Sequence, residues 1–266
     1  MRQSRTRIRK RSAVAFALAT AGALAVAGIA LAAASSTSSF SFRCDGRAVN
    51  NACPKNTFTK GRLFIHTHTN YTNPGSPDGG KTKRIQIFFD NDFRFDPSVT
   101  PRCDPNAVAG VNMATAMANC GPSLIGSGTG QADQPGPSPF PACMLLFNGT
   151  NDANGDPRII LYFRAPVSDC SDPANNTAGS TTIVLPGSLR TTPIGDYSRE
   201  LDIPNIHNVV LAVEDLNFSI RRDSATSSYV KARCFDANRV WNVTTRFTYN
   251  NNTTQTVNSP RTCTVG

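Results

Sequence analysis

The segment "RLFIHTHTNY" (residues 62–71) alternates apolar and polar side chains with a period of two residues. In an extended chain, one face would hold Leu63, Ile65, Thr67 and Tyr71. The opposite face would hold Phe64, His66 and His68. A period of two with one apolar face is typical of a β-strand that is buried on one side. The segment therefore predicts a strand at the surface of a sheet.

The same period recurs along most of the chain after residue 35. Further strands are predicted in residues 84–90, 143–150, 158–167, 181–189 and 216–222. The Gly- and Pro-rich stretch at 73–83 predicts a hairpin that joins the first two strands, and "NDANGDP" (151–157) predicts a second hairpin. Three last segments, 228–236, 239–249 and 253–265, are predicted to form a meander with tight turns at 236–239 and 250–253.

One segment lacks this alternation. In "DPNAVAGVNMATAMANCG" (104–121), Asp104 is a candidate N-cap, Pro105 suits the first helical turn, and Gly121 marks an end. A straight helix over this length would separate Cys103 from Cys120 by about 25 Å, whereas a disulfide needs Cα atoms within about 7 Å. If the two cysteines pair, the helix spans only two or three turns and the chain doubles back.

Many short strands, frequent turn residues and one helical segment predict an all-β fold. We expect an antiparallel double-sheet β-sandwich with one short helix, preceded by an N-terminal signal helix. Residues 35–266 are expected to form a single disulfide-stapled domain.

Residues 1–34 have the order of parts of a secretory signal peptide. Six basic residues stand near the start, an uncharged run rich in Ala follows from Ser12, and Ala32 and Ala34 fit a small-x-small cleavage site. The alternative is an uncleaved membrane anchor, since the run is long enough to span a bilayer. We expect cleavage near Ser35 and a secreted protein that is not in the membrane after cleavage.

The net charge of +9 owes much to this segment. Residues 35–266 contain all 18 acidic residues but only 21 of the 27 basic ones, a balance of +3. Apart from residues 81–84 and 221–222, the basic residues are scattered along the sequence. Because nucleic-acid binding needs basic side chains gathered on one face, no nucleic-acid partner is expected. A cell-envelope or extracellular polymer is the partner class considered, and no cofactor is expected.

All eight cysteines lie after residue 34. An even number in an exported chain predicts four disulfides, and no two cysteines have the close spacing that zinc sites prefer. Sequence alone leaves 105 pairings open. The order of the predicted strands favours near neighbours, and the pairs expected are Cys44–Cys53, Cys103–Cys120, Cys143–Cys170 and Cys234–Cys263.

Several short motifs occur in a fixed order along the chain: "PRC" (101–103), "CGPSLIGSGTGQA" (120–132), "LLFNGT" (145–150), "LDIPNI" (201–206), "SYVKARC" (228–234) and a final "TCTVG". In this order the chain resembles a group of exported, disulfide-bonded, β-rich proteins of high-GC Gram-positive bacteria. The resemblance covers most of the chain after the signal. It implies a location and a fold, and it transfers no catalytic residue.

His66 and His68 are the first candidates for a metal site. Same-face neighbours on a strand lie about 6.6 Å apart, so two imidazoles can reach one ion. A third ligand is needed, and the only other histidine is His207 in a different segment. The alternative is a polar strand face without metal, and we expect no metal site.

Acidic residues give three further candidates. Asp152, Asn154 and Asp156 alternate as in calcium loops, but the trailing glutamate is missing and a hairpin turn is favoured. Asp90, Asp92 and Asp96 alternate near a strand end. Glu200 and Asp202 would share a face if residues 199–203 form a strand, which is the geometry that a glycosidase pair would require.

Enzyme signatures are otherwise missing from the sequence. "GSGTG" (126–130) is not the G-x-S-x-G elbow of serine hydrolases and predicts a close-packed strand. Paired cysteines leave no thiol nucleophile. The sequence therefore predicts a secreted or cell-surface, non-enzymatic protein with a binding or structural role. The alternative is a secreted hydrolase, metal-assisted or carbohydrate-directed, in which polar groups would converge in a cleft.

Overall fold

Strand β3 (Thr59–Asn70) contains the segment that first indicated the fold, and it is buried on one side as its alternation predicts. Leu63, Ile65, Thr67 and Thr69 are buried, whereas the residues between them are exposed or half-buried. The computed structural model describes residues 34–47, 51–70, 81–133, 140–167, 169–171, 180–206, 212–235 and 240–265. All of them belong to one compact unit, Ala32–Gly266.

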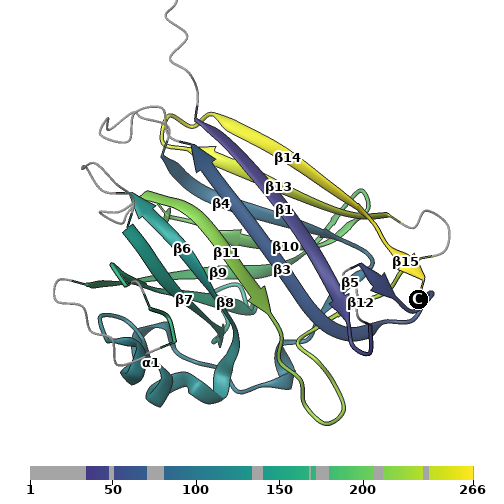
Figure 1. The fold of residues 1–266 in the computed structure, drawn as a ribbon, viewed down its shortest axis with the longest axis horizontal. Helices are drawn as coiled ribbons and strands as arrows, with labels where there is room; N and C mark the ends of the chain where they lie inside the picture. The colour runs from purple at the N-terminus through teal and green to yellow at the C-terminus, as the bar shows by residue number, and fades with distance from the viewer. Residues whose placement is uncertain are drawn as a thin grey trace, which may run out of the picture. The chain divides into compact units, whose positions relative to one another are not determined.

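The described residues form an all-β, sandwich-like fold with one short α-helix (Figure 1). The strands before the helix are β1 (Ser35–Cys44), β2 (Ala52–Cys53), β3, β4 (Thr82–Asp90) and β5 (Phe93–Phe95). Those after it are β6 (Leu124–Asp133), β7 (Phe140–Gly149), β8 (Arg158–Ala165), β9 (Thr181–Ile194), β10 (Tyr197–Ile203), β11 (Ala212–Ile220), β12 (Val230–Ala232), β13 (Val240–Tyr249), β14 (Thr254–Thr262) and β15 (Thr264–Val265).

The two layers of the sandwich are parts of one continuous sheet. Thirteen strands are joined in the order β14-β13-β4-β10-β9-β8-β7-β6-β11-β3-β12-β5, with β1 paired to β3, while β2 and β15 form a small parallel pair. The sheet folds over, so that β1, β3, β11 and β6 lie in front of β4, β10 and β9 in Figure 1. Folding one sheet onto itself buries its inner face without a second, separate sheet.

Aromatic side chains fill the space between the layers. Phe42 of β1 lies edge-on to Trp241 of β13, with ring centroids 6.1 Å apart, and Phe93 contacts both rings at 5.8 and 5.5 Å. Edge-to-face pairs at these distances are favourable beyond the area that they bury. A smaller apolar cluster lies on the other face of β7 and β8, under the helix, and includes Phe147, Tyr162 and Met113.

The predicted hairpin between residues 62–71 and 84–90 is wrong. β3 pairs with β1, β11 and β12, and β4 pairs with β10 and β13, so the two strands lie in different layers. Each strand has an apolar inner side, and Ile65 and Ile87 belong to the same core cluster. The two strands turn these sides toward the same core instead of sharing backbone hydrogen bonds. The loop residues 71–80 lie outside the described part.

The predicted C-terminal meander is only half right. β13 and β14 form the antiparallel hairpin, with Val243 opposite Ser259. β12, the first segment of the supposed meander, instead pairs with β3 and β5. The predicted turn at 236–239 lies outside the described residues. The hairpin across "NDANGDP" is confirmed by the pairing of β7 with β8.

The helical segment is shorter than its N-cap signal indicated. Asp104 caps a single 3-10 turn, Pro105–Ala107, and the α-helix α1 runs from Met113 to Cys120 with Asn112 as its N-cap. The chain doubles back before α1, which brings the Cα atoms of Cys103 and Cys120 to 5.5 Å. This is the compact arrangement that their pairing required.

Four disulfides close the expected loops. The bridges are Cys44–Cys53, Cys103–Cys120, Cys143–Cys170 and Cys234–Cys263, with Cα–Cα distances of 5.3, 5.5, 5.3 and 5.7 Å. Such a set is typical of proteins that reside in an oxidising compartment. The predicted signal helix lies outside the described residues, among which no helix is long and apolar enough to cross a membrane.

Candidate functional site

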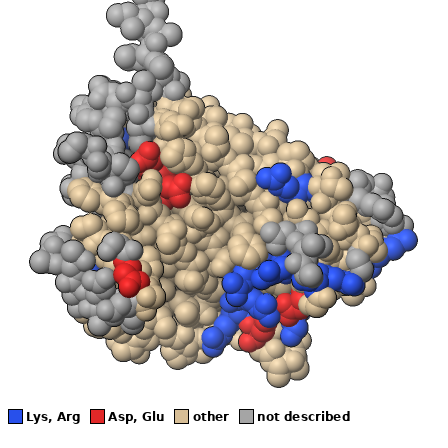
Figure 2. Space-filling model, in the orientation of Figure 1, with Lys and Arg blue, Asp and Glu red and all other residues tan. Residues whose placement is uncertain are grey.

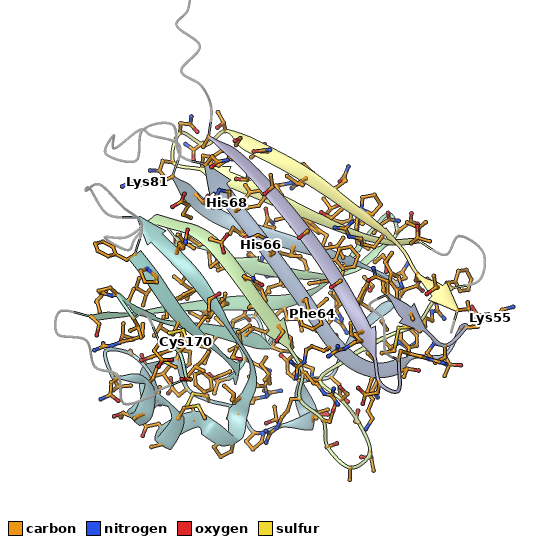
Figure 3. The ribbon with its side chains drawn as sticks, viewed as in Figure 1. Lys55, Phe64, His66, His68, Lys81 and Cys170 are labelled. Atoms are coloured by element: carbon orange, nitrogen blue, oxygen red, sulfur yellow. A yellow bond between two sulfur atoms is a disulfide. The ribbon has the colours of Figure 1, made fainter. Side chains whose placement is uncertain are left out.

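His66 and His68 lie in a row with Phe64 along the outer face of β3 (Figure 3). A carboxylate that the sequence did not reveal lies between them. Asp215 of β11 faces His68 in register, and its Oδ2 lies 2.8 Å from His66 Nε2 and 3.4 Å from His68 Nδ1. His68 Nε2 also contacts Asn70 Oδ1 at 2.9 Å. The two imidazoles thus belong to a surface hydrogen-bond cluster that neighbouring strands assemble.

Metal ligation has no geometric basis in the described ranges. No group of three or more His, Cys, Asp or Glu side chains there is arranged to hold a metal ion. His207, the third candidate ligand that the sequence offered, lies outside those ranges. The His66 and His68 side chains are 47% and 30% exposed, so water shares their hydrogen bonding.

Asp152 organises the turn between β7 and β8. Its Oδ1 accepts hydrogen bonds from the backbone N–H groups of Asn154 and Asp156, and its Oδ2 accepts one from the Ser188 hydroxyl. The Ser188 hydrogen bond is the main cause of the lowered pKa of Asp152. Gly155 has a φ of +87°, which an L side chain rarely adopts. These contacts are those of a hairpin turn, as predicted.

Glu200 and Asp202 share a face of β10 but have separate partners. Gln86 donates to Glu200 Oε1 at 2.6 Å, whereas Asp202 receives two hydrogen bonds from Arg84 at 2.6 and 2.8 Å and an ion pair from Arg190 at 3.0 Å. Hydrogen bonding to Asp202 is the main cause of the raised pKa of Arg84. Both carboxylates are buried and occupied by neighbours, so they do not form an open catalytic pair.

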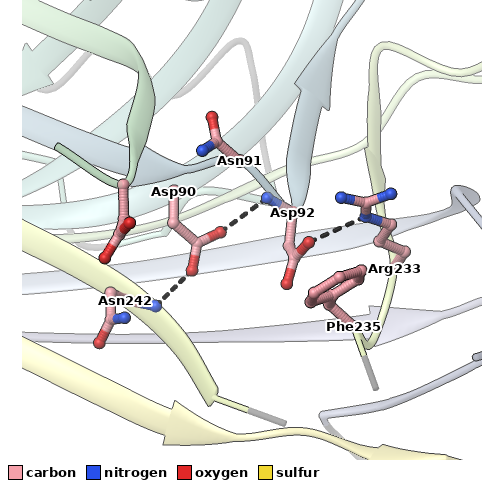
Figure 4. A pocket seen from close by; sticks show the side chains of 7 residues that line it. Asp90, Asn91, Asp92, Arg233, Phe235 and Asn242 are labelled. Carbon is pink, nitrogen blue, oxygen red and sulfur yellow. Dashed lines mark hydrogen bonds and ion pairs between the residues drawn. The ribbon is translucent and has the colours of Figure 1, made fainter. Parts of the chain in front are cut away.

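A pocket of about 220 Å³ lies where β4 ends (Figure 4). Its seven lining residues come from four separate stretches of the chain. They are Asp90, Asn91, Asp92, Asp196, Arg233, Phe235 and Asn242. The pairings of β13 and β10 with β4 bring three of these stretches together, and the pairing of β12 with β5 brings the fourth, which contains Arg233 and Phe235.

Asp90 forms the buried wall of the pocket. Its side chain is 5% exposed, and its carboxylate accepts hydrogen bonds from the backbone N–H groups of Asp92 at 2.9 Å and Asn242 at 2.5 Å. Burial raises the pKa of Asp90 to about 7, although the two hydrogen bonds act in the opposite direction. The nearby Asp92 and Asp196 carboxylates add to the rise. A carboxyl with this pKa changes its protonation state near neutral pH.

Arg233 holds the second carboxylate and an aromatic ring together. Its Nε donates to Asp92 Oδ1 at 2.9 Å, and its guanidinium carbon lies 5.0 Å from the ring centroid of Phe235 and 4.8 Å from that of Phe58. Phe235 is 39% exposed, one of three large apolar side chains of the described chain that face solvent to this degree. The pocket thus offers acceptors, donors and an apolar ring within one small volume.

The sequence anticipated only part of this pocket. Asp90 and Asp92 were candidates, but Asp96 lies outside the lining and caps a 3-10 turn, where hydrogen bonding from Ser98 lowers its pKa. Arg233, Phe235 and Asn242 carried no signal of their own, because each becomes significant only through its neighbours. An exposed aromatic beside a basic residue, in "RCF" (233–235), is the one local hint.

Comparisons with known proteins give no further guide to this site: no protein family, curated protein or solved structure matches the chain.

Proposed function

We propose that this is an exported, non-enzymatic binding protein whose pocket at the end of β4 recognises a hydroxyl-rich ring, such as one sugar unit of a cell-envelope or extracellular polymer. The observation that carries the proposal is the convergence of Asp90, Asp92, Arg233 and Asn242 around an exposed aromatic ring, Phe235.

The mixture of groups suits a sugar. A sugar hydroxyl both donates and accepts hydrogen bonds, so it requires acceptors and donors side by side. The Asp92 carboxylate and the Asn91 and Asn242 amide oxygens accept, and the Arg233 guanidinium and the amide nitrogens donate. The apolar C–H face of a sugar can pack on the Phe235 ring, since aromatic rings bury much area in one rigid piece.

The size of the pocket favours one unit of a chain over a large ligand. Pockets for drug-sized molecules measure about 300–1,000 Å³, and this one is smaller. A second hollow of about 450 Å³ shares Asn91 and Arg233 with it and is also lined by Arg94, Ser198 and Arg199. A polymer could therefore continue from one hollow into the next.

Three observations support export. The residues that follow the predicted signal peptidase cut are part of the folded domain, as strand β1 (Ser35–Cys44). Four disulfides suit an oxidising compartment. The resemblance to exported β-rich proteins of high-GC Gram-positive bacteria agrees with both. N-terminal sequencing of the protein from culture medium is expected to start near Ser35, and a sequence that starts at Met1 would reject cleavage.

Calorimetric titration of the secreted protein tests the binding site. We expect one of a panel of soluble oligosaccharides to bind, and Phe235→Ala and Asp92→Asn each to weaken that binding at least tenfold. Val265→Ala is the control, because Val265 is another exposed apolar residue, 40% exposed, and does not line the pocket. Binding of simple amines or divalent cations without any oligosaccharide would overturn the proposal.

A carbohydrate-directed hydrolase is the second candidate, and one observation favours it. Asp90, with its pKa raised to about 7, lies near Asp92, which Arg233 holds in an ion pair. When two carboxyl groups lie in such different surroundings, one can stay protonated and act as a proton donor while the other stays charged. Release of reducing sugar from the bound oligosaccharide, abolished by Asp90→Asn, would place the hydrolase ahead of the binding protein.

A further inference from the structure

The lower part of the outer face in Figure 2 contains a band of basic side chains, over the ends of β1, β3 and β11. We define the basic band as six residues from five separate stretches of the chain: Arg43, Lys60, Arg62, Arg94, Arg221 and Lys231. The sequence alone did not indicate it, because most of these residues lie far apart along the chain and the pairing of the strands brings them together.

Cross-strand register places like charges directly opposite each other in this band. Arg43 of β1 faces Arg62 of β3. Lys231 of β12 faces Lys60 of β3 on one side and Arg94 of β5 on the other. Like charges in directly opposed positions destabilise a sheet. Three such contacts in one small area therefore destabilise the fold, which suggests that the positive charge serves a binding function.

The carboxylates of the band neutralise only part of its charge. Asp45 lies 3.1 Å from Arg221 and 3.9 Å from Lys60, and Asp223 lies 2.9 Å from Arg221. Six cations and three carboxylates, counting Asp96 near Lys231, leave a net charge of +3, as large as that of residues 35–266 as a whole. The described structure gives the buried Arg62 Nε no hydrogen-bond partner. The band thus holds donors and charge that its own side chains do not use.

From these contacts we infer that the basic band binds a linear phosphate polymer outside the cell. Four of the six cations are arginines, whose planar guanidinium groups can donate two parallel hydrogen bonds to the oxygens of one phosphate. Lys60 and Arg62 lie on the same side of β3, about 6.6 Å apart, with their cross-strand partners beside them. Two rows of cations at this spacing can follow an extended chain of phosphates.

The aromatic side chains of this region favour a polymer without bases. Single-stranded nucleic acids are held by rings on which bases stack. Here Arg94 and Arg233 lie over Phe58, with guanidinium carbons 3.9 and 4.8 Å from its centroid, and Arg43 lies 6.0 Å from that of Phe64. The rings hold guanidinium groups in place and are not open platforms for bases.

Titration of the secreted protein with inorganic polyphosphate, at several salt concentrations, tests this inference. For about four phosphate contacts, affinity should fall by roughly 50-fold between about 50 and 200 mM salt, since each contact to a flexible strand contributes about −0.7 to the logarithmic slope. In the double variant Arg43→Thr/Arg62→Thr, the slope should become shallower by about 1.4. Neither arginine lines the pocket at β4, so this result is independent of the proposed sugar site.

The matched control removes two positive charges elsewhere, in Lys83→Thr/Arg246→Thr. Lys83 lies in β4 and Arg246 in β13, and both are exposed. The control should bind polyphosphate almost as wild type does, and thermal melting should show that Arg43→Thr/Arg62→Thr is folded and no less stable. The inference is overturned if polyphosphate does not bind at low salt, if both double variants lose affinity equally, or if single-stranded DNA of equal charge binds more tightly.

Discussion

The Asp90 carboxylate of β4 accepts a hydrogen bond of 2.5 Å from the backbone N–H of Asn242 in β13. This contact joins two neighbouring strands at the rim of the pocket and keeps a carboxyl group where water hardly reaches it. The same burial raises the pKa of Asp90 to about 7. The proposed binding site therefore contains a group that titrates in the physiological range, and its protonation is linked to the stability of the fold.

The first prediction concerns this linkage. A carboxyl whose pKa is higher in the folded than in the unfolded chain stabilises the fold fully below the unfolded pKa of about 3.9. That stabilisation is lost as pH rises through about 7. Urea unfolding should thus give a lower free energy of unfolding at pH 8 than at pH 5, with Asp90 contributing on the order of 2 kcal/mol to the difference.

Asp90→Asn is the variant that isolates this effect. The amide cannot titrate, so the contribution of residue 90 to the pH dependence between 5 and 8 should disappear. The variant should also be less stable at both pH values, because an amide NH₂ cannot accept from the N–H groups that Asp90 binds. An unchanged pH dependence in this variant would contradict the assignment.

The second prediction concerns the ion pair between Asp202 and Arg84. Asp202 is 2% exposed, and its removal leaves Arg84 and Arg190 without their buried partner. Both arginines are more than a third exposed and can turn to water, so Asp202→Ala should cost about 2–3 kcal/mol, less than a fully buried pair would. Asp156→Ala is the control: its contact to Arg190 is 3.7 Å long and solvent-shared, and its loss should cost below about 1 kcal/mol.

The third prediction concerns Gly128 of β6. A Cβ atom at this position would lie 2.2 Å from the backbone oxygen of Asn217 and 2.7 Å from Phe218 Cα. Because backbone atoms of a central strand cannot move aside cheaply, Gly128→Ala should destabilise the protein by more than about 3 kcal/mol or prevent its secretion. At Gly121 the nearest atom is Met117 Cε at 3.7 Å, so Gly121→Ala should be secreted and melt near the wild-type temperature.

The fourth prediction concerns His66 and His68. Their contacts with Asp215 are exposed to solvent, and exposed ion pairs contribute about 0–1 kcal/mol. Replacing both histidines by alanine should therefore leave the free energy of unfolding within about 1 kcal/mol of wild type, and a chelator should not change the melting temperature. Zinc retained in a one-to-one ratio through dialysis, and lost in the double variant, would show that these residues hold a metal.

The sequence by itself determined which face of β3 is buried and where the chain turns between β7 and β8, and it favoured the cysteine pairs that the structure contains. The alternation in β3, the Asn-Gly turn before β8 and the closely packed glycines of β6 are local signals, read from side chains a few residues apart. Pairs of near neighbours were favoured and are the ones present, including Cys234–Cys263, although the meander on which that pair was predicted does not form. The sequence also limited the length of the helix, because a disulfide between Cys103 and Cys120 requires their Cα atoms to lie within about 7 Å.

Only the tertiary structure decided which strands are neighbours. Every strand edge presents the same backbone donors and acceptors, so the pattern of β3 and β4 could not exclude the hairpin that they do not form. The pocket and the basic band both depend on such pairings: Asn242 reaches Asp90 because β13 pairs with β4, and Arg43 meets Arg62 because β1 pairs with β3. A binding site whose residues come from different strands therefore cannot be predicted until packing of the core has determined which strands pair.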